Sequence, residues 1–262
     1  MSGLHMESTL AHAWPRPEIR RIGIPDLRDA LARGWDDFMA TPTQLVFLCL
    51  LYPVVGFLAA RAAIGDLKPL LWPLLAGLSI MGPVLAIGMY EISRRREKGL
   101  PSSWSTAFAA LRSPAIGGIV VLGLVLLLLF ALWVVAAQGI YDATMGKGVP
   151  DTISGFLNAI LYSGAGVRLI VLGNLVGAVF AAIALSISVV SFPMMLDRLC
   201  GPTLAVQTSL RVVARNPVPM LVWGLIVAVL LVLGAIPALI GLAVVMPLLG
   251  HATWHLYRRT VM

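Results

Sequence analysis

Charge is what this sequence has least of. Only 12% of its 262 residues are charged, whereas 59% are hydrophobic and the mean hydropathy is +0.93. An ordinary soluble domain carries about twice that share of charged residues. The composition therefore excludes a soluble fold and predicts an integral membrane protein.

Cysteines and catalytic motifs are also scarce. The two cysteines, Cys49 in an apolar block and Cys200 in a polar loop, provide no disulfide framework. The sequence contains no phosphate-cradling glycine loop, no zinc-binding HExxH motif, no nucleophile elbow and no paired carboxylates within its apolar blocks. We therefore expect neither enzymatic activity nor a resident cofactor.

Long apolar blocks dominate what is present. A bilayer core needs about 20 apolar residues per helix, and blocks that are apolar on all sides favour helices over barrel strands. The predicted fold is all-α, a polytopic bundle of about six transmembrane helices built from repeated hairpins, with short amphipathic helices on the cytoplasmic surface. The blocks comprise residues 44–63, 70–90, 115–137, 169–192, 218–235 and 238–257.

The basic residues indicate an orientation. The net charge is +7, but the basic residues are scattered over short loops, which argues against a nucleic-acid partner. Most of them lie before the first block, after the second, after the fourth and at the C-terminus. Because cytoplasmic loops are enriched in Lys and Arg, both termini are predicted to be cytoplasmic, in a bacterial inner membrane. The opposite side holds only Arg61, Lys68, Lys147 and Arg168.

Three similar junctions indicate an internal repeat. A small polar residue precedes proline at 41–42, 113–114 and 216–217, a pattern typical of helix starts. Amphipathic stretches precede these junctions at 24–40, 103–112 and 203–215, and we expect them to lie on the membrane surface or to cap the bundle. The predicted organisation is a polar tail, 1–23, and a single membrane domain, 24–262, with repeat units at about 24–99, 100–200 and 201–262.

Three strings carry a family resemblance: GMYEISRRREKG at 88–99, SFPMMLD at 191–197 and HATWHLYRR at 251–259. Over roughly Arg20 to Met262 the chain resembles a bacterial family of uncharacterised integral membrane proteins, a domain of unknown function. The resemblance implies a membrane fold and no particular mechanism. Some members are labelled cytochrome c oxidase subunit I. We do not extend that label to this chain, because haem-copper oxidase subunits use more spans and more intramembrane histidines.

Two histidines form the first candidate site. His251 and His255 are four residues apart, so both rings project from one helix face and could bind a metal ion or a haem. Alternatively, they lie at the membrane interface with Trp254 and Tyr257, which would anchor the helix end as an aromatic belt.

Charged residues near the block ends form the second candidate site. Glu91 and His255 each follow a proline by eight residues, so the repeat predicts either a pair between them or a pair of Glu91 with Arg94 or Arg95. Asp197 and Arg198 are expected to form an interfacial ion pair.

Other side chains give weaker indications. Soft sulfur ligands for copper are present, but their spacing matches no ligand motif, so packing is the simpler interpretation. They are Met194, Met195, Met246 and Cys200. Asn174 is the strongest candidate within an apolar centre for a side chain that lines a solute pathway. Ser186, Ser188 and Ser191 lie in the same block.

The sequence favours a non-enzymatic accessory, scaffold or assembly protein whose partners are the lipid bilayer and a membrane-protein complex. The alternatives are a small-solute transporter and a haem- or metal-binding protein that uses the histidine pair.

Overall fold

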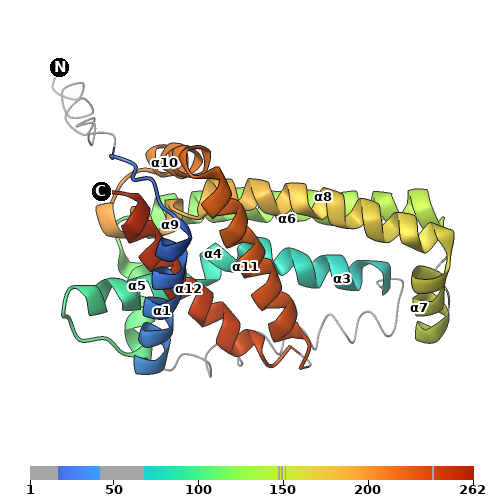
Figure 1. Cartoon of the computed structure of the whole chain (residues 1–262), viewed down its shortest axis with the longest axis horizontal. Helices are drawn as coiled ribbons and strands as arrows, with labels where there is room; N and C mark the ends of the chain where they lie inside the picture. Colours follow the sequence, from blue (N-terminus) through green and yellow to red (C-terminus); the bar gives the residue numbers. More distant parts are fainter. Residues whose placement is uncertain (1–16, 42–67, 147, 149, 151, 238) are drawn as a thin grey trace, which may run out of the picture.

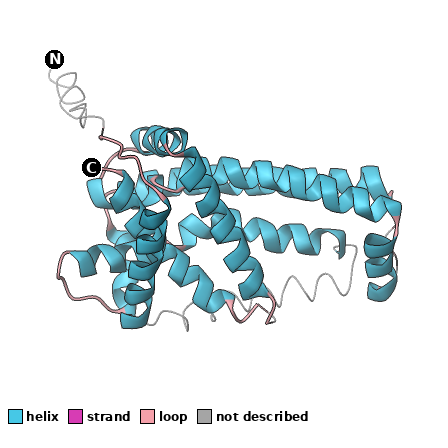
Figure 2. Cartoon of the chain, in the orientation of Figure 1, coloured by secondary structure: helices cyan, strands magenta, loops and turns pink. Residues whose placement is uncertain are grey.

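The computed structural model describes residues 17–41, 68–146, 148, 150, 152–237 and 239–262. Within these ranges every regular element is a helix, and strand-like pairing is limited to one bridge between Ile19 and Val261 (Figure 2). The all-α prediction is therefore confirmed. The first predicted span, 44–63, lies outside the described residues, as does Cys49.

The described elements follow one another along the chain with short connections. They are α1 (Ile24–Ala40), α3 (Lys68–Gly77), η1 (Leu78–Met81), α4 (Gly82–Leu85), α5 (Ile87–Glu97), η2 (Trp104–Arg112), α6 (Ile116–Met145), α7 (Ile153–Tyr162), α8 (Gly164–Ser188), α9 (Ser191–Arg198), α10 (Pro202–Arg215), α11 (Pro217–Ala235) and α12 (Leu242–Thr260).

Four stretches of the described chain are long and apolar enough to cross a membrane, judged by length and composition. They are Trp72–Glu97, Ile116–Met145, Gly164–Arg198 and Pro217–Ala235, which correspond to the second to fifth predicted spans. Helix α12 occupies the sixth predicted block but is not among them. Its C-terminal half carries two histidines and two arginines, and most of that half is buried in the protein.

The helices form a long part and a compact part (Figure 1). Helices α6 and α8 run side by side in opposite directions, because α7 joins their far ends, and α3 lies alongside α6. Helices α1, α5, α9 and α12 gather at the other end of the molecule. The compact part therefore combines segments from the beginning, middle and end of the chain.

The amphipathic helix α1 packs against α12. Its apolar stripe buries Leu27, Ala30 and Phe38. At the crossing point, a Cβ on Gly34 would lie 2.6 Å from the backbone nitrogen of Ala252, so only glycine permits this approach. The structure therefore has the stretch 24–40 packed on the bundle, as in one of the two expected positions, and the membrane-surface position stays a prediction.

Local sequence signals predicted only some of the helix starts correctly. Helix α11 begins at Pro217, as predicted. Asn216 does not cap it, since its Oδ1 accepts from the Ile22 backbone N–H (2.8 Å) and its Nδ2 donates to the Arg20 carbonyl (3.2 Å). Helix α6 begins at Ile116, later than the predicted junction, and η2 is a 3₁₀ helix.

The described end of the predicted N-terminal tail is bound to the C-terminus. The Arg20 backbone N–H donates to the Thr260 carbonyl (3.0 Å), and the Met262 N–H donates to the Glu18 carbonyl (3.0 Å). Together with Asn216, these bonds hold the segment before α1 in place. These bonds thereby help to set the position of α1 on α12.

Candidate functional site

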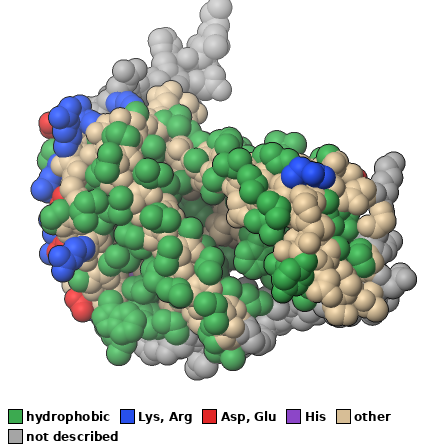
Figure 3. Space-filling model, turned by 45° about the vertical axis from the view of Figure 1, so that its right-hand side comes forward, with side chains coloured by type: hydrophobic (Ala, Val, Ile, Leu, Met, Phe, Trp, Pro, Cys, Tyr) green, Lys and Arg blue, Asp and Glu red, His purple; other side chains and the backbone are tan. Residues whose placement is uncertain are grey.

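Ionisable side chains gather where α1, α5, α9 and α12 meet. In Figure 3, basic and acidic side chains lie along one edge of a face that is otherwise mostly hydrophobic. Many of them belong to two neighbouring groups. The Asp37 cluster comprises Asp37, Ser93, Arg96, His251 and His255, and the Asp197 cluster comprises Glu97, Lys98, Asp197, Arg198, Trp254, Tyr257 and Arg258.

Asp37 joins three helices. Its Oδ2 accepts from Ser93 Oγ (2.5 Å) on α5 and lies 2.8 Å from His255 Nε2 on α12. Its Oδ1 accepts from Arg96 Nε (2.7 Å), also on α5. The residue is 6% exposed, so this carboxylate fixes α1 against both partner helices from within the protein.

The surroundings of Asp37 keep it ionised. Burial by itself raises the pKa of Asp37, but hydrogen bonds from His255, Ser93 and Arg96 outweigh burial and lower the pKa to about 2. A carboxylate that stays charged attracts the single hydroxyl hydrogen of Ser93. The direction of this hydrogen bond decides which ring nitrogen of His251 carries the hydrogen.

His251 is held in one tautomer. Because Ser93 donates to Asp37, the His251 Nδ1 that lies 2.8 Å from Ser93 Oγ must carry the hydrogen and donate. Its Nε2 is then an acceptor, and it has no hydrogen-bond partner in the described part of the chain. His251 is fully buried, so this lone pair faces the protein interior.

The two histidines meet one carboxylate through different routes. His255 contacts Asp37 directly, and His251 contacts it through Ser93. In the residues that the structure describes, no three or more His, Cys, Asp or Glu side chains are grouped so as to hold a metal ion. Metal or haem binding by this pair stays a prediction.

Trp254 and Tyr257 do not form an interfacial belt. Trp254 is 1% exposed and Tyr257 is fully buried. Their polar atoms bond inside the protein, since Trp254 Nε1 donates to Glu97 Oε2 (3.0 Å) and Tyr257 donates to Asp197. The predicted aromatic belt is therefore wrong for these two residues.

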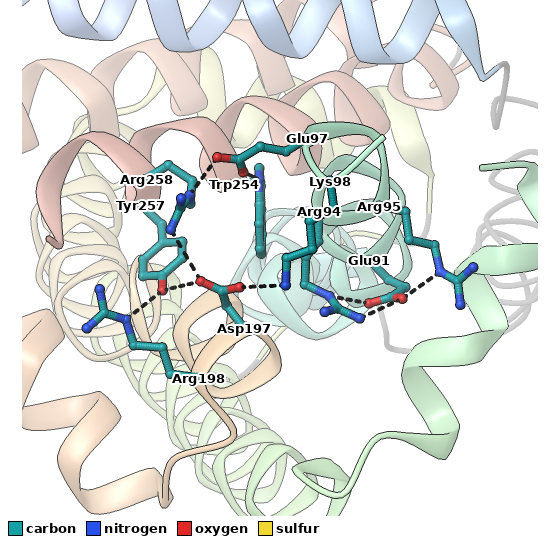
Figure 4. Close-up of polar contacts among 10 residues, drawn as sticks. All are labelled: Glu91, Arg94, Arg95, Glu97, Lys98, Asp197, Arg198, Trp254, Tyr257 and Arg258. Carbon is teal, nitrogen blue, oxygen red and sulfur yellow. Dashed lines mark hydrogen bonds and ion pairs between the residues drawn. The ribbon is translucent and has the colours of Figure 1, made fainter. Parts of the chain in front are cut away.

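Glu91 pairs within its own helix. It accepts from Arg94 Nε (2.8 Å) and Arg95 Nε (2.7 Å), as Figure 4 shows. Of the two predicted alternatives, the pair of Glu91 with Arg94 and Arg95 is the one that forms, whereas the Glu91–His255 pair does not, because His255 is bound to Asp37. Side chains three and four residues apart on a helix meet without further ordering of the chain, which favours the local pair.

Tyr257 stands between Asp197 and Arg198. Its hydroxyl donates to Asp197 Oδ2 (2.9 Å) and accepts from Arg198 Nε (3.3 Å), so the predicted direct Asp197–Arg198 ion pair is also wrong (Figure 4). Asp197 instead lies 3.6 Å from Lys98 Nζ and 3.4 Å from Arg258 Nη1. The cluster joins α5, α9 and α12.

The sulfur-bearing residues do not gather at one point. Met194 and Met195 are buried in the main core, where Cys200 Sγ donates weakly to the Met194 carbonyl (3.9 Å). Met246 instead packs with Met89 and Ala243 in a separate small cluster. This arrangement fits packing.

The uncharged polar side chains noted in α8 and α9 bond to nearby backbone carbonyls. Asn174 Nδ2 donates to the Ile170 carbonyl (2.7 Å). Ser186, Ser188 and Ser191 likewise donate to carbonyls four residues earlier. Such bonds satisfy polar atoms within an apolar helix.

The apolar helices and the polar end define an integral membrane protein of unknown function. Residues 71–197 match the family described as "Predicted integral membrane protein (DUF2189)", which confirms the predicted resemblance. The match includes GMYEISRRREKG and SFPMMLD and ends before HATWHLYRR. No curated protein and no solved structure gives a significant match.

Proposed function

We propose that the protein is a non-enzymatic accessory, scaffold or assembly protein of the bacterial inner membrane, with the Asp37 and Asp197 clusters at its cytoplasmic end. Arg96, Arg198 and Arg258 lie in or beside these clusters, whereas Arg168 lies near the start of α8, at the α7 end. The concentration of arginines at one end supports this orientation by the positive-inside rule.

The observation that carries the proposal is how little of the spanning helices the described part of the chain covers. In the most apolar stretch of α6, 22% of the residues are buried, and in that of α11 the share is 17%. Large apolar side chains such as Leu128 and Leu132 on α6 and Leu221 on α11 are more than half exposed. These faces suit contact with lipid or with the helices of another membrane protein.

A large groove between the helices is also apolar. It has a volume of about 950 Å³ and lies between α3, α5, η2, α6 and α11. Ser79 is the one hydroxyl-bearing side chain among the described residues that line it, and its Oγ is bonded to the Ala76 carbonyl (2.6 Å). A path for a polar solute needs polar groups that face it, so the groove argues against the transporter alternative.

Site-specific photo-crosslinking in living cells tests the proposal. A photoreactive phenylalanine analogue would replace Leu128 on α6 or Leu221 on α11. Tyr162 on α7, which is 84% exposed, provides a matched control position away from both faces. We expect one discrete product with a second membrane protein from at least one test position and none from Tyr162.

Two results would count against the proposal. One is the same diffuse set of products from all three positions, which would indicate random collision. The other is saturable solute uptake by vesicles that contain the purified protein alone, which would favour a transporter.

A further inference from the structure

A charged cleft opens between α1, α5 and α12 on the outer side of the Asp37 cluster. Its volume is about 540 Å³. We propose that this arginine cleft binds a phosphate group. The lining residues are Arg20, Arg33, Asp36, Asp37, Arg96, Glu97, His255, Arg258 and Arg259.

The charge balance of the cleft favours an anion. Five arginines and three carboxylates line it, and Asp29, just outside the lining, pairs with both Arg33 and Arg259, so one positive charge remains in excess among these residues. Two of the carboxylates already accept hydrogen bonds, Asp37 from α5 and α12, and Glu97 from Trp254 and Arg258. Asp36 is exposed and meets no donor among the described residues, so it is the lining carboxylate whose charge is not paired.

The arginines keep donors for a ligand. In the described contacts, Arg96 uses only its Nε, toward Asp37, and Arg33 uses only its Nε, toward Asp29. Arg259 uses only its Nη2, also toward Asp29. A guanidinium group has five N–H donors in a planar fork that matches phosphate oxygens, so each of these groups can bind a phosphate with its remaining N–H groups.

The cleft is held in shape before a ligand arrives. The close contact of Gly34 with Ala252 fixes α1 on α12, and Asp37 bonds to both other walls. A preformed site loses less entropy on binding. The volume exceeds that of a phosphate alone and lies in the range of small-ligand pockets, so it can accommodate the group that carries the phosphate.

The phosphate can belong to a soluble compound or to an anionic lipid headgroup, because the cleft lies at the polar end of a membrane bundle. Titration calorimetry on the full chain in a neutral detergent separates these sources. One arm uses inorganic pyrophosphate, with sodium chloride of equal ionic strength as the reference. The other arm uses short-chain phosphatidylglycerol, with short-chain phosphatidylcholine as the reference.

Three single-charge variants test the cleft itself. Arg33→Gln removes a lining guanidinium and should weaken binding about fivefold or more, whereas Asp36→Asn removes the unpaired carboxylate and should tighten it about threefold. Arg28→Gln is the matched control, because Arg28 is an exposed residue of α1 that does not line the cleft. Its effect should be less than about twofold.

The pattern of outcomes decides the proposal. Saturable binding of pyrophosphate alone assigns a soluble phosphate compound, and binding of phosphatidylglycerol alone assigns a lipid headgroup. The proposal is overturned if neither probe binds, or if Arg33→Gln and Arg28→Gln weaken binding equally. It is also overturned if Asp36→Asn, which changes an exposed side chain without described contacts, leaves the affinity unchanged.

Discussion

Asp37 and His255 are 218 positions apart in the chain, yet Asp37 Oδ2 lies 2.8 Å from His255 Nε2. The Arg96 guanidinium binds the other carboxylate oxygen. The position of α1 therefore depends on one buried charge that α5 and α12 share.

The variant Asp37→Asn tests that dependence. It leaves Arg96 and His255 without their charged acceptor, and we expect the free energy of unfolding to fall by about 2–4 kcal/mol. Thermal unfolding in detergent measures the change. Asp36→Asn, on the neighbouring exposed residue, is the control and should change stability by less than about 0.5 kcal/mol. Equal effects of the two variants would refute the role given to Asp37.

The same carboxylate predicts a dependence on pH. Its pKa is lowered from 3.8 to about 2, so its contribution is fully present above about pH 4 and is lost as the pH falls through about 2. That contribution is about 2 kcal/mol. We expect the difference in stability between the wild type and Asp37→Asn to shrink between about pH 4 and pH 2. A constant difference across this range would contradict the assignment.

The close approach of α1 to α12 predicts an intolerant glycine. In Gly34→Ala, the new Cβ would lie 2.6–2.7 Å from Ala252 backbone atoms, which cannot rotate away. We expect a loss of about 1–3 kcal/mol, seen as a lower midpoint of thermal unfolding. Gly139→Ala, on α6, is the control because a Cβ there would meet nothing within 4 Å. A Gly34→Ala protein as stable as this control would show that the helices do not touch as described.

The bridging hydroxyl of Tyr257 predicts coupling within the Asp197 cluster. Tyr257→Phe removes one donor to Asp197 and one acceptor for Arg198, and should cost about 1 kcal/mol. Asp197→Asn should cost more, since Lys98 and Arg258 also lose an ionised partner. A double-mutant cycle should give a coupling energy of at least about 0.5 kcal/mol between the two sites. Additive effects would mean that the hydrogen bond contributes nothing.

Local patterns predicted α1 and the start of α11. The amphipathic stretch 24–40 became α1 with the same bounds, and the Asn216–Pro217 junction became the start of α11. These features depend on neighbours in the sequence, through hydrophobic spacing and the fixed φ of proline. The internal repeat and its unit boundaries stay predictions.

Such local patterns could not predict which side chains pair across distant parts of the sequence. Asp36 and Asp37 are adjacent acidic residues on α1, and only the packing of α1 on α12 turns Asp37 inward and leaves Asp36 exposed. Ser93 gave no sequence signal for its place between Asp37 and His251. The Glu91–His255 prediction assumed that equivalent hairpin positions face each other, whereas His255 faces α1.

Purification in a native detergent, with the mass and composition of the complex measured directly, tests the accessory function most directly. We expect another membrane protein to co-purify at a fixed ratio. That partner should be lost when Leu128 and Leu132 on the exposed face of α6 are both replaced by Trp, and should be retained in Tyr162→Trp. A chain that purifies alone and drives saturable solute uptake in vesicles would contradict the account.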